Sequence, residues 1–158
     1  MTTSTAVHTV LAPDEGLRLQ SGPGRDLVFK VTGEDTGGAF DYFTVEVAPE
    51  GGPPLHVHHK QEETIQVLDG RFKVRIGDEV FELEQGGFAY LPSKVPHAFL
   101  NLTDAPAEII VVYTPGGGHH FYAELGPATR NGPPDRAVVA AIFEKHDMSL
   151  LGPPLSDD

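Results

Sequence analysis

The chain of 158 residues contains no cysteine. Without thiols it can form neither disulfide bonds nor thiolate metal ligands, so a metal site would have to use histidine and carboxylate side chains. Basic residues are scarce too: 11 Lys and Arg stand against 23 Asp and Glu, giving a net charge of −12. No basic stripe is present to bind the phosphates of a nucleic acid or an anionic membrane, and we expect neither partner.

Long apolar runs are also lacking. No segment approaches the roughly 18 consecutive apolar residues that a membrane-spanning helix needs. The first residues, 1–13, have neither the cationic start nor the apolar stretch of a secretory signal. We therefore expect a cytoplasmic protein.

Glycine and proline are abundant, with 18 and 14 copies, which disfavours long helices and suits short strands joined by tight turns. Period-2 alternation of apolar and polar residues marks strands with one buried face, as in Phe43, Val45 and Val47. Turn pairs such as Asp69-Gly70 separate such runs. Strands are predicted over residues 17–20, 26–31, 40–48, 55–58, 62–68, 72–76, 80–84, 88–91, 97–102 and 107–114. Evenly spaced short strands indicate a sandwich or a closed barrel.

The character of the chain changes after residue 116. A short helix is predicted over 119–125, ending at Gly126-Pro127, and a second over 134–145, where apolar residues recur at helical spacing. Residues 152–158 are expected to be frayed. The whole chain, 1–158, is interpreted as one domain with a loose N-terminal tail (1–14), a barrel core (25–115) and C-terminal helices (117–146).

Three segments carry a candidate metal site. His56 and His58 are two residues apart, which places both imidazoles on one face of a strand. Glu63 shares the face of the apolar residues in its strand, whereas Glu62 lies on the other face, so Glu63 is predicted to point inward. His97 stands on a later strand and completes the set.

The types of these four side chains indicate which metals could bind. Three imidazoles and one carboxylate suit Zn, Fe, Ni, Mn or Cu, and contain too few oxygens for a dedicated Ca or Mg site. A carboxylate such as Glu63 buried among apolar walls would be costly without a cation. We therefore predict one divalent transition metal ion, whose identity the pattern leaves open. His59 has the opposite parity and should face solvent, while His119 and His120 are expected at a helix cap or on the surface.

These residues resemble the two motifs of the cupin family. The first motif joins a His-x-His to a Glu and a Gly, and the second runs Gly, Pro, His, Asn; here they read His56-Val57-His58, Glu63 and Gly70, then Gly86, Pro92, His97 and Asn101. Two loop positions depart from the motifs: a glycine falls one residue late at Gly51, and Lys94 stands where a glycine is usual. The resemblance covers roughly residues 25 to 115.

Within this family the chain is most similar to small single-domain proteins related to quercetin 2,3-dioxygenase. Residues 54–59 and 114–117, followed by a short aromatic helix, carry that likeness. The resemblance implies a mainly β cupin fold, a double-stranded β-helix or jelly-roll barrel with a short C-terminal helical segment. It also implies a metal held by His56, His58, Glu63 and His97, with Glu63 as the catalytic base. Barrels of this kind often pair, so a homodimer is expected.

Other positions support two interpretations each. Asn101 shares the face of His97 and is predicted either to anchor that imidazole from the second shell or to fix a loop. Phe43, Phe99 and Tyr113 either line an aromatic substrate pocket or belong to the plain core.

The resulting functional hypothesis is a metal-dependent dioxygenase that uses dioxygen on a small chelating aromatic or flavonol-like substrate. One alternative is a metal-dependent isomerase, cyclase or lyase in which the ion acts only as a Lewis acid. A second is a non-catalytic protein that binds a small metabolite.

Overall fold

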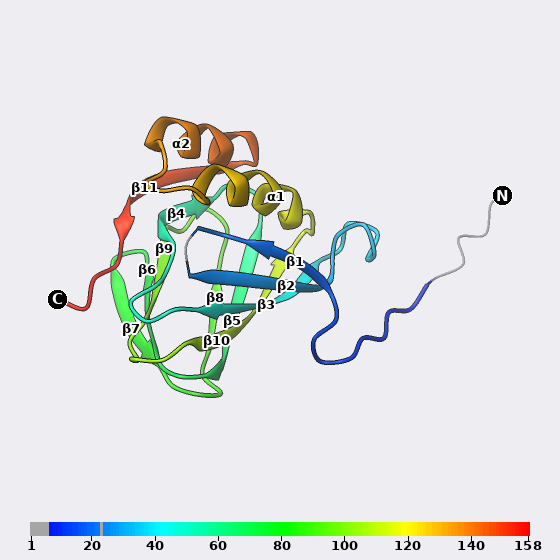
Figure 1. Cartoon of the computed structure of the whole chain (residues 1–158), viewed down its shortest axis with the longest axis horizontal. Coiled ribbons are helices and arrows are strands. Elements are labelled where there is room, and N and C mark those ends of the chain that lie inside the picture. The colour runs from blue at the N-terminus through cyan, green and yellow to red at the C-terminus, as the bar shows by residue number, and fades with distance from the viewer. Residues whose placement is uncertain (1–6, 23) are drawn as a thin grey trace.

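The computed structural model describes residues 7–22 and 24–158. Two antiparallel sheets form a jelly-roll barrel of the cupin type, with two helices lying along one side (Figure 1). One sheet has the order β1-β2-β3-β10-β5-β8 and the other β11-β4-β9-β6-β7. The strands are β1 (Leu17–Gln20), β2 (Arg25–Val31), β3 (Asp41–Val47), β4 (Pro54–His58), β5 (Glu62–Asp69), β6 (Phe72–Ile76), β7 (Glu79–Leu83), β8 (Phe88–Leu91), β9 (His97–Asn101), β10 (Ala107–Thr114) and β11 (Met148–Pro154).

The predicted strands β1 to β10 are confirmed, most of them to within one residue at each end. Their alternation is the reason: in β3, every second residue from Asp41 to Val47 is buried, so its apolar side chains face the barrel interior. The interior core includes Phe29, Phe43 and Phe72, each at most 2% exposed. Apolar burial on this scale is the main force that closes the two sheets onto each other.

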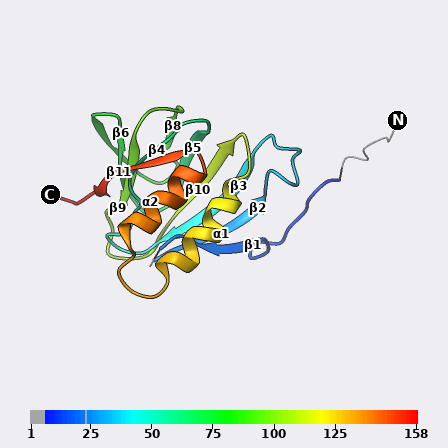
Figure 2. The ribbon, with the colours of Figure 1, turned by 90° about the horizontal axis from the view of Figure 1, so that it is seen from above.

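The helices are α1 (Gly118–Thr129) and α2 (Arg136–Lys145), and they lie side by side over the strands when the molecule is seen from above (Figure 2). Asp135 caps α2, its Oδ1 accepting hydrogen bonds from the backbone N–H groups of Ala137 and Val138. Neither helix among the described residues is long and apolar enough to cross a membrane. The predicted tail falls partly on residues 1–6, which lie outside the described residues, and residues 7–12 form no helix or strand.

The predicted end of the first helix at Gly126-Pro127 is wrong, because α1 continues through both residues to Thr129. Proline lacks the N–H that would bond to the preceding turn, which usually ends a helix. Here tertiary packing prevails: a Cβ at Gly126 would lie 2.9 Å from the carbonyl oxygen of Gln20, so only glycine lets α1 come this close to β1. The Thr129 hydroxyl in the last turn accepts a hydrogen bond from the Gly22 N–H.

The prediction that residues 152–158 are frayed is also wrong for residues 152–154, which belong to a strand. Met148–Pro154 forms β11, which pairs antiparallel with β4 from Met148 opposite His58 to Pro154 opposite Pro54. The two prolines at its end are tolerated because β11 is an edge strand, where a missing N–H costs no ladder bond. The strand that carries two of the predicted ligands is therefore flanked by β11 on one side and β9 on the other.

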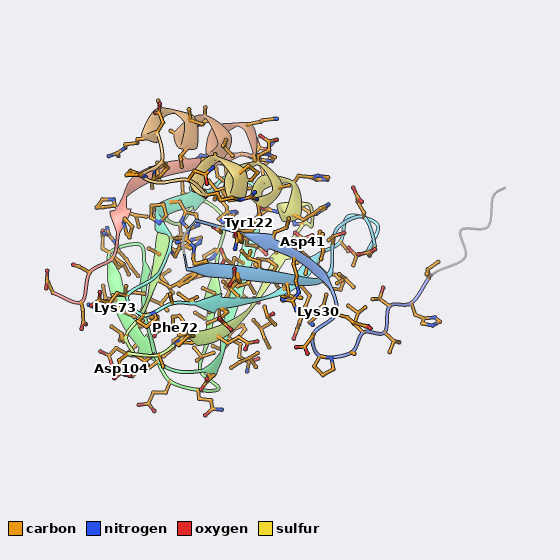
Figure 3. All side chains as sticks on the ribbon, viewed as in Figure 1. Lys30, Asp41, Phe72, Lys73, Asp104 and Tyr122 are labelled. Carbon is orange, nitrogen blue, oxygen red and sulfur yellow. The ribbon has the colours of Figure 1, made fainter. Side chains whose placement is uncertain are left out.

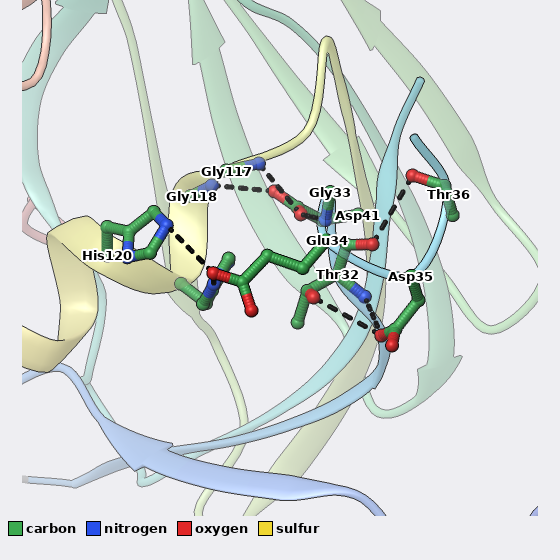
Figure 4. A network of polar contacts seen from close by, with 10 residues as sticks. Thr32, Gly33, Glu34, Asp35, Thr36, Asp41, Gly117, Gly118 and His120 are labelled. Carbon is green, nitrogen blue, oxygen red and sulfur yellow. Dashed lines mark hydrogen bonds and ion pairs between the residues drawn. The ribbon is translucent and has the colours of Figure 1, made fainter. Parts of the chain in front are cut away.

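A buried carboxylate joins the loop after β2 to the start of α1 (Figure 4). Asp41 is fully buried and accepts hydrogen bonds from the backbone N–H groups of Gly33, Gly117 and Gly118 at 2.7–2.9 Å. Charge-assisted bonds of this kind are the strong ones. They hold the first turn of α1 against the barrel, which sets where the helix lies over the strands.

A close backbone approach gives a test of the fold. A Cβ at Gly52 would overlap the backbone carbonyl oxygen of Phe99 on β9, so G52A must displace one of the two chains. We expect it to lower the free energy of unfolding by about 2 kcal/mol or more in urea denaturation. The matched control is G152A, whose new methyl would meet Leu55 at an ordinary 3.7 Å. Equal stability of the two variants would contradict the packing described.

Candidate metal centre

Both sheets contribute to the site. His56 and His58 lie on β4, and His97 lies on β9 directly opposite His56 in the register of the two strands. Glu63 comes from the other sheet, on β5, where it pairs with Leu91 and Tyr113. The four side chains therefore meet between the sheets, inside the barrel.

The structure brings the four predicted side chains together. Each offers a ligand atom, all within 4.8 Å of one another, and each side chain is buried. Oε2 of Glu63 lies 2.8 Å from Nε2 of His97 and 3.4 Å from Nε2 of His58. Glu62 is exposed whereas Glu63 is only 4% exposed, so the inward direction predicted for Glu63 from strand parity is confirmed.

Each imidazole is held through its other ring nitrogen. Nδ1 of His56 lies 2.8 Å from the carbonyl oxygen of Pro54, and Nδ1 of His97 lies 3.4 Å from that of Val95. Nδ1 of His58 lies 3.2 Å from Oε1 of Gln61, whose amide in turn donates to the Pro115 carbonyl. Oxygen acceptors at Nδ1 favour the tautomer that leaves the Nε2 lone pair free, which is the arrangement of metal-binding histidines.

Orphaned polar atoms at the centre test whether a metal fits. Nε2 of His58, Nε2 of His97 and Oε2 of Glu63 are buried, and none makes a hydrogen bond of good geometry to a described residue, although they lie close together. Buried polar atoms without partners are costly. A cation bound among them would satisfy all three at once, so this group could hold a metal ion, and its nitrogen and oxygen donors suit a divalent transition metal.

Burial keeps two of the imidazoles neutral. It lowers the pKa of His56 well below the usual value, helped by the neighbouring His97 and His58, and it lowers the pKa of His58 to about 3. Burial opposes charge on His97 as well, but the adjacent Glu63 carboxylate outweighs it and raises the pKa of His97. Neutral imidazoles are the form that binds metals, so among the three imidazoles the proton on His97 is the one that competes most with a metal.

A cavity of about 420 Å³ opens beside the site. His56 and Glu63 form part of its wall, and the three predicted pocket residues, Phe43, Phe99 and Tyr113, line it as well. The helices supply further apolar walls: Phe121, Leu125, Val139 and Phe143. A mostly apolar hollow with a few convergent polar groups is the usual form of a small-molecule site.

The side chain of Asn101 fixes a loop. Its amide nitrogen donates to the carbonyl oxygens of Val47 and Ala105, and its Oδ1 accepts from the N–H and hydroxyl of Thr103. These bonds support the loop-fixing interpretation of Asn101, and the acceptor found next to the His97 ring is the Val95 carbonyl instead. Lys94, at the motif position where glycine is usual, has a φ of 70°, a left-handed conformation that glycine adopts more easily.

The remaining histidines divide between solvent and core. His59 is exposed, as predicted. His120 is exposed beside Glu34, with 3.5 Å between Nε2 and Oε1 (Figure 4), whereas the neighbouring His119 is only 8% exposed, contrary to the expected cap or surface position. The cause is the close docking of the α1 N-terminus on Asp41, which carries His119 against Phe29.

Sequence reasoning missed two polar residues at the site. Gln61 lies in the short loop between β4 and β5, where nothing in a strand pattern marks it. Tyr122 lies on α1 over the strands (Figure 3), and its hydroxyl is 2.6 Å from that of Tyr113. Its position depends on how α1 docks, which local sequence does not report.

Comparisons with known proteins agree with this geometry. Residues 43–113 match the family described as cupin domain. The chain is 27% identical over 115 residues to quercetin 2,3-dioxygenase of Bacillus subtilis, a match that covers 68% of this chain and 34% of that protein. The matched region covers 59% of the length of one curated relative and 34% of the length of the other, so this chain spans less than two thirds of each.

Solved structures show the same fold. KdgF from Halomonas sp. superposes with a TM-score of 0.62 at 17% identity, covering 69% of this chain and 96% of that one. A cupin-superfamily sugar phosphate isomerase from Silicibacter pomeroyi gives a TM-score of 0.57 at 26% identity, covering 66% and 74%.

Removing one imidazole tests the metal site. We expect the wild-type chain to bind one divalent ion such as Ni²⁺ or Zn²⁺, and H58A to weaken binding by about a hundredfold or more, because a ligand is lost. The control is H59A, which removes the exposed neighbouring imidazole. Isothermal titration calorimetry of the metal-free proteins measures both affinities. Similar affinities in the two variants would place the ion elsewhere.

The raised pKa of His97 predicts the direction of a pH effect. The proton on His97 must leave before its Nε2 can bind a metal, so affinity should rise with pH through that pKa, whereas His56 and His58 are already neutral. We expect binding at about pH 6 to be weaker than at about pH 8. Calorimetry in two buffers of different ionisation enthalpy should show proton release on binding. An affinity independent of pH would contradict the assignment.

Proposed function

We propose that the protein is a metal-dependent dioxygenase acting on a small chelating aromatic or flavonol-like substrate, a proposal supported by the match of residues 43–113 to the cupin domain family and by the similarity to quercetin 2,3-dioxygenase. The observation that carries the proposal is the buried group His56, His58, Glu63 and His97 at the wall of an apolar cavity. The similarity to quercetin 2,3-dioxygenase favours oxygen chemistry over other reactions.

The cavity supports an aromatic substrate. Phe43 and Phe99 provide flat apolar surface, and Tyr113 provides a ring with a polar tip beside the His58 imidazole, 5.1 Å between ring centroids. A planar ligand can bury its faces against these rings while its oxygens reach toward the four ligand groups. Walls of this kind are less suited to a polar sugar.

In the proposed reaction a bound metal and Glu63 have separate roles. A divalent metal bound there would supply Lewis-acid and redox chemistry toward the substrate oxygens and dioxygen. Glu63 is the one carboxylate in the group, and a carboxylate can serve as the base that accepts the proton of a substrate hydroxyl. The apolar walls exclude water, which protects a reactive carbanion from simple protonation.

The Tyr113 and Tyr122 hydroxyls form the other polar edge of the cavity. Burial raises the pKa of both phenols, so both are neutral donors at physiological pH. Their mutual bond of 2.6 Å uses only one of the two protons. The second is available to a substrate oxygen, which would orient the ring relative to Glu63.

Substituting Glu63 tests the chemistry. With metal-loaded protein and quercetin in air, we expect dioxygen uptake that matches substrate loss, and none without air. E63Q should lower kcat by about a hundredfold or more, because the amide cannot accept a proton. E62Q removes the exposed neighbouring carboxylate and should leave kcat unchanged. An oxygen electrode and the absorbance of quercetin provide the measurements.

The same experiment separates the alternatives. Turnover of a chelating substrate that continues without air, or with redox-inert Zn²⁺ alone, would instead indicate an isomerase, cyclase or lyase. Metal binding with no turnover of any chelating aromatic would indicate a binding protein.

A further inference from the structure

The side chain of Arg25 is a cationic group in the cavity wall. It does not belong to the four candidate metal ligands His56, His58, Glu63 and His97, which we call the metal group. Arg25 begins β2 and is half-buried as a residue, and the Nε atom of its guanidinium is buried. Nη2 donates to the Ser21 hydroxyl at 3.1 Å, and the buried Nε has no hydrogen-bond partner among residues 7–22 and 24–158. Arg25 forms no ion pair with any residue that the structure describes. A buried charge is thus left without a counter-charge.

Such an arrangement is unfavourable in the free protein. Buried arginines are normally paired with carboxylates, because removing a charge from water is costly. Burial lowers the pKa of Arg25 to about 10, so the group still carries its charge at neutral pH. The ionisable groups that interact with it are Tyr122 and Tyr113, and both are neutral there. The resting protein therefore does not balance this charge.

Arg25 lines the same cavity as His56 and Glu63. Tyr122 interacts electrostatically with Arg25 and with Glu63, since after burial the Glu63 carboxylate also raises the pKa of Tyr122, while Arg25 lowers it. The hydroxyls of Tyr113 and Tyr122, two further residues that line the cavity, lie 2.6 Å apart. Apolar side chains such as Phe121 and Leu125 fill the surrounding wall. The cavity wall thus combines candidate metal ligands, apolar side chains and one cationic group.

We propose that Arg25 is the anion-binding residue of this cavity, and that the natural ligand is an aromatic compound bearing a carboxylate. The inference rests on the proposed use of the cavity as the substrate site and narrows its substrate class. A carboxylate supplies two acceptors to the planar guanidinium, including the unpartnered Nε, and an aromatic body packs against the apolar side chains of the wall. The bound carboxylate supplies the counter-charge that the resting protein lacks.

A second arginine makes a matched control. Arg136, at the start of α2, also lines the cavity, but it is exposed to solvent. Its charge is screened and hydrated, so it should contribute little to discrimination between an anion and a neutral molecule. Comparing the two arginines separates recognition inside the cavity from general attraction at its rim.

The test measures binding by metal-free protein of 2-naphthoate and of its neutral isostere 2-naphthamide. By calorimetry we expect wild type to prefer the carboxylate by about ten- to a hundredfold, the range for hydrogen bonds to a charged group. R25M should reduce the preference to about onefold, R25K should keep part of it, and R136M should keep most of it. R25M should also unfold at a temperature no lower than wild type, because it removes an uncompensated buried charge.

Two results would overturn the proposal: no preference for the carboxylate in wild type, or the same preference in R25M. If R25M does not fold, R25Q removes the charge with a polar side chain, and its preference is compared with that of R25K. Because the protein is metal-free, the outcome does not depend on oxygen chemistry. If dioxygen uptake is observed but the carboxylate preference does not depend on Arg25, only this inference is wrong. If the preference depends on Arg25 but no dioxygen is taken up, only the proposed dioxygenase activity is wrong.

Discussion

The structure depends on placing four polar ligand atoms within 4.8 Å of one another inside an apolar barrel. Such a cluster costs several kcal/mol unless its lone pairs are satisfied. The protein meets part of that cost with fixed acceptors, the Pro54 and Val95 carbonyls and the Gln61 amide, which hold the outer ring nitrogens. The inner atoms of His58, His97 and Glu63 make no hydrogen bond of good geometry among the described residues, so a bound cation could recover much of the remainder.

The two parts of the molecule contribute differently to the cavity. The barrel strands carry all four side chains that could hold a metal, whereas α1 and α2 supply much of the apolar wall and the Tyr122 hydroxyl. Asp41 fixes the first turn of α1 through three backbone N–H groups, so the wall has a defined position relative to the metal group. A change in the helical segment can therefore alter the ligand that fits while leaving the metal group intact.

Much of this arrangement could be predicted from sequence, because the deciding signals are local. Strand parity alone distinguished Glu63 from Glu62, and alternation located the strands from β1 to β10. The errors arose where distant contacts override local preference: α1 continues through Pro127 because it packs on β1, and β11 forms despite two prolines because β4 offers an open edge. Arg25 belongs to the same class, since a residue at the start of a strand shows no sign of reaching a cavity closed by helices from the other end of the chain.

The pairing of β11 with β4 also affects the order in which the molecule can be assembled. During synthesis β4 emerges with its ligands long before residues 148–154, and until then one side of it is an unpaired sheet edge. The pairing joins residues about ninety positions apart, so it cannot form on the ribosome until residues 148–154 have been synthesised. The nascent chain thus exposes a histidine-bearing edge strand to solvent, to other chains and to free metal ions before the barrel wall around it is complete.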